Sequence, residues 1–229
     1  MRFLFLLLAL SFFNFGKAQE TIFASGTLPE VSLSYKLSSS YKINSKIESF
    51  HAIHSDPPVE AKNWDYRHRG TDIKIFASRK LNPFNSLAIG YQFGIEPGDP
   101  SSHRTIQQFS FVRRPGNILF GHRFRTDQTF ATNESPEFRV RYRLSLEIPL
   151  NGLSIDPGEF YLVASEEVIY GFRECRSSFE NRINLLVGHY FRSKNKLQFG
   201  LDYRTGIQED LFAHILWLKV GWYVNLEKQ

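Results

Sequence analysis

The amino-acid sequence predicts an all-β fold, a single closed antiparallel transmembrane β-barrel of twelve strands with a polar lumen lined by Arg and Glu. Three observations support this prediction. Apolar and polar residues alternate along most of the chain from about Val31 onward. No apolar stretch after the first residues reaches the roughly 18 residues of a membrane-spanning helix, and aromatic residues make up 15% of the chain. Alternation gives each strand one apolar and one polar face, and strands that cross a membrane must close into a barrel.

The start of the chain has the layout of a secretory signal peptide. Arg2 precedes an apolar run at residues 3–13, and the small-residue site Gly16-Lys17-Ala18 precedes Gln19. A membrane-spanning helix needs about 20 apolar residues, and polar residues interrupt this run. We therefore expect cleavage of residues 1–18, which leaves residues 19–229 as an exported barrel domain.

Alternation and turn residues predict eleven visible strands. They lie near residues 30–37, 41–53, 72–80, 86–95, 103–113, 117–130, 137–149, 159–170, 179–191, 196–205 and 212–226. Bacterial outer-membrane barrels have an even number of strands. We therefore expect a twelfth, short strand at residues 21–25, and a barrel of ten strands is the alternative.

The predicted connections between the strands alternate between two kinds. Tight turns are expected at residues 38–40, 81–85, 114–117 and 192–195, and longer loops at 54–71, 96–102, 131–136 and 171–178. The segment 151–158 breaks this alternation, because it is long where a tight turn is due. Short turns on one rim and longer loops on the other are typical of outer-membrane barrels.

The alternation also assigns side chains to the two faces of the barrel. The predicted lipid-facing residues are Leu87, Ile89, Tyr91, Phe93, Ile95, Phe120, Phe124, Val140, Tyr142, Leu144, Leu146, Ile183, Leu185, Val187, Leu197, Phe199, Leu201, Tyr203, Leu216, Leu218, Val220 and Trp222. The predicted lumen charge network consists of Arg123, Arg125, Arg139, Arg141, Arg143, Glu147, Glu167, Arg182, Asp202 and Arg204. A lipid-facing Arg or Lys near the membrane centre costs about 2–4 kcal/mol. Glu166 and His189 fall on the apolar face, and we expect a rim position or a bulge to explain both.

The same strands carry a family resemblance. The stretches 123–130, 138–150, 161–167 and 181–191, including the run Phe138-Arg139-Val140-Arg141-Tyr142-Arg143-Leu144, resemble in order and spacing the domain-of-unknown-function 2490 family. That family comprises small outer-membrane β-barrel proteins of Gram-negative bacteria. The resemblance covers nearly the whole mature chain, and it implies a barrel fold and an outer-membrane location. Because the family has no established activity, the resemblance implies no catalytic residue.

These observations favour an outer-membrane barrel that is not an enzyme. Its lumen is either plugged by the Arg and carboxylate network or forms a narrow path that prefers anions. Outer-membrane lipids are the expected partners, a small anionic solute is a candidate, and the oligomeric state is left open. The chain has 28 basic and 23 acidic residues. Two of the basic residues lie in the signal peptide, so the remaining charge is too small to indicate a nucleic-acid partner.

Two alternatives remain from the sequence. One is an outer-membrane enzyme acting on lipid, an acyl hydrolase or acyltransferase, for which Ser49 with His51, Ser55 with His54 or Ser165 with His189 would have to meet. The other is a soluble secreted β-sandwich or lipocalin-like binding protein.

No cofactor or metal is expected. His51 and His54, three residues apart on a strand, would point to opposite faces, and no cluster of Cys and carboxylate residues completes a metal site. The lone thiol of Cys175 is predicted to lie in a surface loop, with no assigned role.

Overall fold

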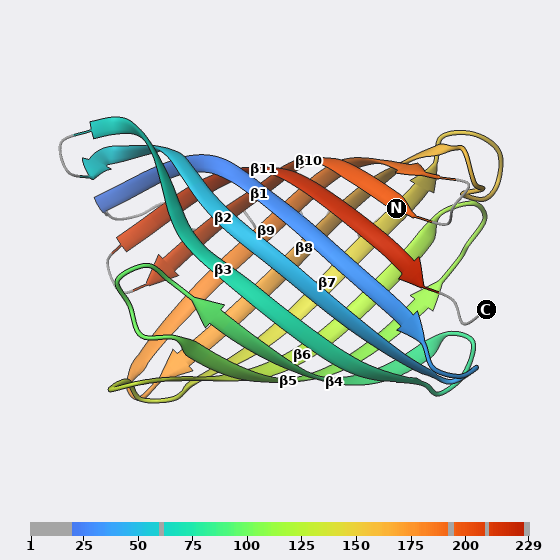
Figure 1. Ribbon diagram of the computed structural model, residues 1–229, viewed down its shortest axis with the longest axis horizontal. Helices are drawn as coiled ribbons and strands as arrows, with labels where there is room; N and C mark the ends of the chain where they lie inside the picture. Colours follow the sequence, from blue (N-terminus) through green and yellow to red (C-terminus); the bar gives the residue numbers. More distant parts are fainter. Residues whose placement is uncertain (1–19, 60–61, 192–194, 209–210, 227–229) are drawn as a thin grey trace.

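The structure, a computed structural model, describes residues 20–59, 62–191, 195–208 and 211–226. Within these residues the chain folds into one closed barrel of eleven strands (Figure 1). The strands are β1 (Glu20–Lys36), β2 (Tyr41–Val59), β3 (Lys62–Lys80), β4 (Asn85–Ile95), β5 (Ser102–Arg113), β6 (Leu119–Ala131), β7 (Glu137–Pro149), β8 (Phe160–Arg173), β9 (Arg176–Tyr190), β10 (Lys196–Gln208) and β11 (Leu211–Leu226). The predicted signal peptide at residues 1–18 lies outside the described residues.

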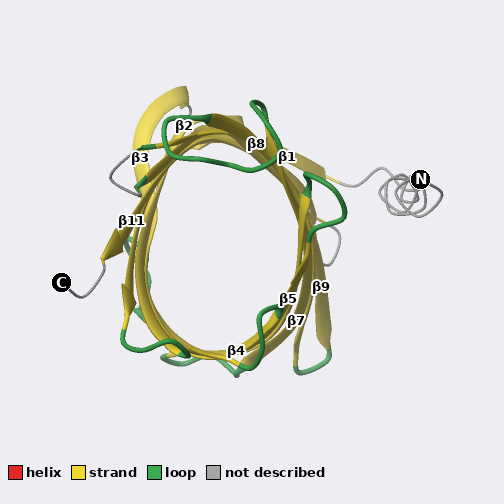
Figure 2. Ribbon diagram, turned by 90° about the vertical axis from the view of Figure 1, so that its right-hand side faces the viewer, coloured by secondary structure: helices red, strands yellow, loops and turns green. Residues whose placement is uncertain are grey.

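The barrel closes between its first and last strands, and the ring is complete when viewed along the barrel axis (Figure 2). Consecutive strands pair antiparallel, whereas β1 pairs with β11 in parallel over Glu20–Tyr35. The predictions of twelve strands, of ten strands and of a purely antiparallel sheet are therefore wrong. With an odd number of alternating strands, the first and the last run in the same direction.

The miscount comes from the first strand. The expected separate strand at residues 21–25 is the beginning of β1, which continues through Gly26 and Pro29. Its register with β2 shifts after Ser25, and a Cβ at Gly26 would lie 1.9 Å from the backbone oxygen of His51. Pro29 lacks an N–H group, but it lies where the β1–β2 register is interrupted, while the parallel ladder with β11 runs on unbroken. Gly26 and Pro29 therefore mark an irregularity within one strand.

The expected difference in loop length between the two rims is also absent. We call the rim with the β1–β2 connection the first rim (right in Figure 1) and the other the second rim. Residues 54–59 and 62–71, part of a predicted loop, extend β2 and β3 into long strands. Residues 171–178 reduce to a turn at Glu174 and Cys175, where Glu174 has φ 53° and Cys175 is exposed. The connection at residues 150–159, which the sequence singled out, is long and lies on the first rim.

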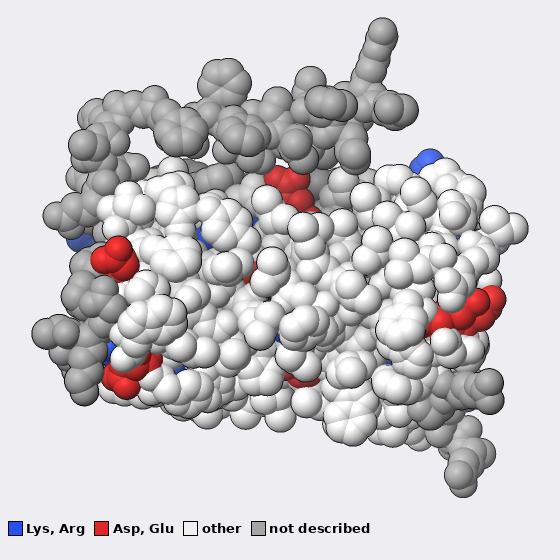
Figure 3. Space-filling model, turned by 90° about the horizontal axis from the view of Figure 1, so that it is seen from above, with Lys and Arg blue, Asp and Glu red and all other residues white. Residues whose placement is uncertain are grey.

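The strands alternate between an apolar outer face and a polar inner face, as β8 illustrates, where every second residue from Tyr161 to Gly171 is buried. Half-exposed aliphatic side chains cover the middle of the barrel's outside: Ile47, Ile73, Ile75, Ile89, Val140, Ile183, Leu185, Leu201 and Leu218. Many exposed aromatic side chains lie toward the two rims: Tyr35, Tyr41, Phe84, Phe160 and Trp222 at the first, and Phe130, Phe138, Tyr170, Phe172 and Phe179 at the second. Tyr91, Phe124 and Phe199 are exposed farther from the strand ends. One outer face is mostly uncharged (Figure 3).

The outer face also carries polar side chains, among them Gln107, Thr126 and Gln128, which hydrogen-bond to one another. Glu166 and His189 are the two that the sequence singled out. Glu166 lies in the middle of β8, opposite Leu144 and Ile183, and the register of β8 is continuous there, so the expected bulge or rim position is wrong for this residue. The Asn181 side chain donates a hydrogen bond of 2.9 Å to Glu166. His189, in contrast, is the penultimate residue of β9 and lies near the first rim.

Two small apolar clusters lie inside the barrel. Phe76, Ala88 and Ile106 form one, and Tyr161, Val163 and Leu186 form the other. The described residues include no helix long and apolar enough to cross a membrane. Most of the interior is lined by polar and charged side chains, so these decide what the barrel can do.

Candidate functional site: the charged lumen

The barrel encloses a cavity of about 490 Å³. Its lining carries eleven basic residues, Lys42, Lys46, Lys74, Arg123, Arg125, Arg141, Arg143, Arg182, Lys196, Arg204 and Lys219, and five acidic residues, Glu30, Glu48, Glu147, Glu167 and Asp202. The cavity runs from the first rim, where Lys42 is exposed, to the middle of the barrel. An excess of positive charge on a partly enclosed wall attracts anions.

The second-rim side of the cavity ends at a layer of tightly packed side chains. This closing layer consists of Leu28, Gln92, Ile106, Asp127, Ile169 and Trp217, each at most 5% exposed. The Trp217 ring packs against Phe50 with 5.8 Å between ring centroids, and Arg204 lies 5.3 Å from the centroid of the same Phe50 ring. Side chains this well packed leave little room for water, which favours a cavity that is closed toward the second rim.

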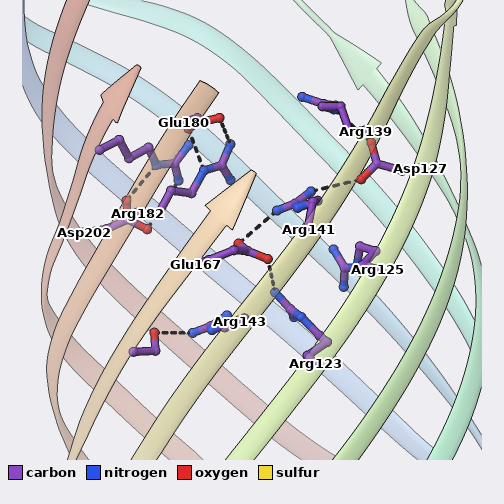
Figure 4. A network of polar contacts seen from close by, with 12 residues as sticks. Arg123, Arg125, Asp127, Arg139, Arg141, Arg143, Glu167, Glu180, Arg182 and Asp202 are labelled. Carbon is purple, nitrogen blue, oxygen red and sulfur yellow. Dashed lines mark hydrogen bonds and ion pairs between the residues drawn. The ribbon is translucent and has the colours of Figure 1, made fainter. Parts of the chain in front are cut away.

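Inward residues of β5–β7 form what we call the arginine wall: Arg104, Arg123, Arg125, Asp127, Arg139, Arg141 and Arg143, with Glu167 from β8 beside them. Figure 4 labels all of these residues except Arg104. Asp127 is completely buried; its Oδ1 accepts a hydrogen bond of 2.9 Å from Arg139 and lies 3.6 Å from Nε of Arg104. Arg141 donates to Asp127 at 3.3 Å and to Glu167 at 3.0 Å. Arg141 therefore links the two carboxylates.

Two guanidinium groups of this wall have no carboxylate partner among the described residues. Arg125 donates to the amide oxygen of Gln108 at 2.7 Å and lies 5.2 Å from the centroid of the Phe76 ring. Arg143 donates to the hydroxyl of Ser165 at 2.8 Å. In Figure 4, Arg125 has no contact to the acidic groups that are drawn.

A second group of inward residues, which we call the lysine wall, lines the opposite side from β1–β3 and β11. It consists of Glu30, Lys46, Glu48, Asp72, Lys74 and Lys219. Glu30 lies 2.8 Å from the amino groups of both Lys46 and Lys219. Glu48 binds Lys46 at 2.6 Å and also pairs with Lys74. Here three cations meet three carboxylates.

The strands between the two walls carry paired charges. Arg182 forms two hydrogen bonds to Glu180, at 2.6 Å and 2.9 Å. Arg204 donates to Asp202 at 2.7 Å. Both pairs join residues two positions apart on one strand, which lie on the same face.

The structure places the predicted network residues as follows. The residues that line the cavity are Arg123, Arg125, Arg141, Arg143, Glu147, Glu167, Arg182, Asp202 and Arg204. Arg139 lies beside them on Asp127, and Glu147 lies apart near the first rim, 3.7 Å from Lys196.

Sequence reasoning missed the lysine wall, Asp127, Glu180 and Arg104. The signal was present, because Lys42, Lys46 and Glu48 alternate with Ile43 and Ile47 in the same way as the arginines alternate with apolar residues in β7. Asp127 lies two residues after Arg125 and therefore on the same face of the strand as Arg123 and Arg125. The outward positions of these strands carry more polar residues than those of β7, so the alternation is less regular there and does not distinguish the inner face as clearly.

The outer face brings together one of the Ser and His pairs weighed from the sequence. The hydroxyl of Ser49 lies 2.9 Å from Nε2 of His51, and Nδ1 of His51 lies 2.9 Å from the hydroxyl of Tyr66. Ser49 also contacts the hydroxyl of Thr71 at 3.1 Å. The β2–β3 register skips Arg69 beside this cluster, which turns Tyr66 outward like Thr71.

The other sequence candidates for chemistry do not come together. Ser165 points inward and binds Arg143, whereas His189 lies on the outer face near Phe160. No group of three or more metal-binding side chains occurs in the part of the chain that the structure describes.

No curated protein and no solved structure matches the chain significantly. The family described as "Protein of unknown function (DUF2490)" matches over residues 26–209. This match spans β1 to β10 and includes both walls of the lumen except Lys219. The chain therefore belongs to the DUF2490 family, a family of unknown function with, in this member, a closed β-barrel fold.

Proposed function

We propose that this protein is an outer-membrane barrel whose lumen is blind: a cation-rich cavity entered from the first rim and plugged toward the second. The observation that carries this proposal is the closing layer, whose six side chains come from β1, β4, β5, β6, β8 and β11 and are at most 5% exposed. Between the plugged scaffold and the narrow anion path expected from the sequence, this layer favours the plugged scaffold. The excess of basic residues remains on the open side of the plug.

The outer face supports a membrane location. Apolar side chains cover the middle, and ten exposed aromatic side chains lie toward the two rims, which resembles the apolar band of about 25 Å and the two aromatic girdles of outer-membrane barrels. A soluble lipocalin-like barrel would need the reverse, with apolar side chains inside and polar side chains in water. Glu30, Asp127 and Glu167, each at most 5% exposed, lie inside.

Fractionation and conductance test this proposal. The protein should be recovered with the outer membrane, and its folded form should migrate differently on gels before and after heating. In planar bilayers it should show no stepwise conductance. Recovery from the soluble periplasm without detergent would overturn the membrane location, and steady single-channel conductance would overturn the plug.

A second candidate function, hydrolysis of a lipid ester, is supported by the contacts of Ser49. A serine whose hydroxyl contacts a histidine that is itself held by a third group has the arrangement of a hydrolase nucleophile, base and orienting residue. Neighbouring Ile47 and Ile73 belong to the aliphatic band, whereas Ser49 and Thr71 begin the polar part of the long strands β2 and β3. The cluster therefore lies at the depth where lipid esters meet water.

In this reaction the Ser49 oxygen would attack the acyl carbon and pass its proton to Nε2 of His51. The alcohol would leave with that proton, and water would release the acyl group from Ser49. The test is phospholipid hydrolysis in vesicles by the wild type, Ser49→Ala and, as a control, His214→Gln. His214 is another outer histidine bonded to a tyrosine, Tyr203, at 2.6 Å. Activity that Ser49→Ala abolishes and His214→Gln leaves would support hydrolysis; inactivity of the wild type would rule it out.

A further inference from the structure

We propose that Arg123, Arg125, Arg141 and Arg143, which we call the arginine quartet, bind a small oxyanion of the phosphate class with two or more negative charges. The site lies in the cavity on the inner face of β6 and β7. This inference rests on the proposed function in one respect, since the ligand reaches the site through the first rim. It adds a ligand class and a set of binding residues to the blind lumen.

The register of β6 and β7 creates the charge problem that the ligand would solve. Arg123 lies directly opposite Arg143, and Arg125 directly opposite Arg141. Like charges facing each other across two strands destabilise a sheet. Two facing pairs of this kind, side by side on one inner face, place four guanidinium groups within reach of one another.

The carboxylates nearby do not neutralise all four groups. Glu167 accepts from Arg123 at 2.7 Å and from Arg141 at 3.0 Å, and Asp127 is shared by Arg139 and Arg141. Arg125 and Arg143 contact only neutral oxygen atoms among the described polar groups. Arg125 and Arg143 therefore remain on the cavity wall without a carboxylate among the described residues, and a divalent anion would balance the charges of these two side chains.

The quartet also has hydrogen-bond donors to spare. The Nε atoms of all four arginines are buried and lack a hydrogen-bond partner among the described residues. A buried donor without a partner costs free energy, and a guanidinium group offers a planar set of donors that suits phosphate oxygens. Phosphate therefore fits better than chloride, which has a single charge and no fixed acceptor geometry.

The surroundings of the quartet suit a small, hydroxylated or partly protonated ligand. The cavity of about 490 Å³ has room for a phosphate and a few further atoms. Its lining includes neutral hydrogen-bonding groups from Gln108, Asn184 and Gln198. Lys42 and Lys196 line the part near the first rim, where positive charge raises the local concentration of anions.

Binding of inorganic phosphate to the refolded barrel in detergent micelles tests the inference. Calorimetric titration at constant ionic strength should show saturable binding to the wild type, with chloride as the reference salt. Arg125→Gln and Arg143→Gln should each weaken binding at least tenfold. Arg79→Gln, which removes a cation from the outer face where it lies 5.7 Å from the Tyr41 ring centroid, should leave binding unchanged.

A measurement on the unaltered protein covers the case in which a variant does not fold. Phenylglyoxal modifies accessible arginines, and peptide mass spectrometry locates the products. Phosphate should slow modification of Arg125 and Arg143 by several fold relative to chloride and leave Arg79 unaffected. Equal modification in both salts, or equal phosphate binding by the wild type and both quartet variants, would overturn the inference.

These results separate the inference from the proposed function. A protein that is plugged in bilayers but shows no phosphate binding contradicts the quartet alone. A protein that binds phosphate through the quartet and also conducts contradicts the plug alone.

Discussion

The lysine wall and the arginine wall line the same lumen but balance their charges differently. On the lysine wall, Lys46, Lys74 and Lys219 meet Glu30, Glu48 and Asp72, and each cation contacts at least one carboxylate. On the arginine wall, six guanidinium groups meet Asp127 and Glu167, and among the described residues only Arg139 has a further carboxylate, Glu137 at 3.8 Å. The lysine wall balances its own charges, whereas the arginine wall has an excess of positive charge.

This difference assigns separate roles to the two walls. Paired charges on the lysine wall stabilise the barrel, and unpaired arginines on the arginine wall supply the anion site that we propose. A carboxylate between two cations satisfies all three groups, as Glu48 does on the lysine wall, and it leaves little affinity for an added anion. Facing arginines repel each other unless an anion joins them. We therefore expect substitutions on the two walls to differ in size and in sign.

The largest effect is expected for Glu167→Gln. This change removes the carboxylate that Arg123 and Arg141 share and leaves more positive charge on the wall that already has an excess. Breaking a buried ion pair by removing one partner costs about 3–5 kcal/mol. The free energy of unfolding, measured by urea titration in micelles, should fall by that amount. A loss under about 1 kcal/mol would mean that the arginines do not depend on Glu167.

Leu144→Arg should have the next largest effect, because it adds a cation to the outer side of the arginine wall. Leu144 points outward between Arg143 and Ser145, opposite Glu166 of β8. An outward Arg near the membrane centre costs about 2–4 kcal/mol, so the amount of heat-modifiable protein in the outer membrane should drop sharply. Normal assembly of this variant would mean that no hydrocarbon covers this face.

Removing a balanced cation should cost less. Lys74→Gln removes one of the two lysines on Glu48 and the partner of Asp72 at 3.2 Å. Because Lys46 stays on Glu48 at 2.6 Å, the expected loss is about 1–3 kcal/mol of unfolding free energy. An unchanged urea midpoint would contradict the balance that we describe on the lysine wall.

Removing a surplus cation should cost least. Arg125→Gln leaves no carboxylate without a partner and reduces repulsion with the facing Arg141. In phosphate-free buffer its unfolding free energy should stay within about 0.5 kcal/mol of the wild type or rise. If this variant lost as much stability as Lys74→Gln, the two walls would not differ as proposed.

The sequence predicted the parts of the fold that depend on alternation. The two-residue alternation in β7 assigned Arg139, Arg141 and Arg143 to one face. The alternation along most of the chain also predicted a closed barrel, which the structure confirms. The sequence did not predict eleven strands, because the even number expected of outer-membrane barrels led to a separate strand at residues 21–25, whereas these residues belong to β1 and pair with β11 without a break. Pairing between the two ends of a chain leaves no local signal.

The contacts within the site were also beyond sequence reasoning. Parity places Arg125 inside the barrel, but only the register shows that it faces Arg141 and lies away from a carboxylate. Ser49 and His51 meet Tyr66 because the β2–β3 register skips Arg69. The sequence contains no signal for this bulge. The sequence alone gave no reason to distinguish Arg141 from Arg125, whereas the structure makes Arg141 the link between Asp127 and Glu167.

The central claim is that hydrocarbon covers the outer face of the barrel while the charged face lines the lumen. Nitroxide labels introduced singly at residues 183–187 of β9, in protein reconstituted into vesicles, test it directly. Ile183, Leu185 and Val187 point outward, and Asn184 and Leu186 point inward. Collision rates with oxygen, which concentrates in lipid, should be high at the three outward positions and low at the two inward ones. The reverse alternation, or outward labels reached mainly by a water-soluble nickel complex, would contradict the claim.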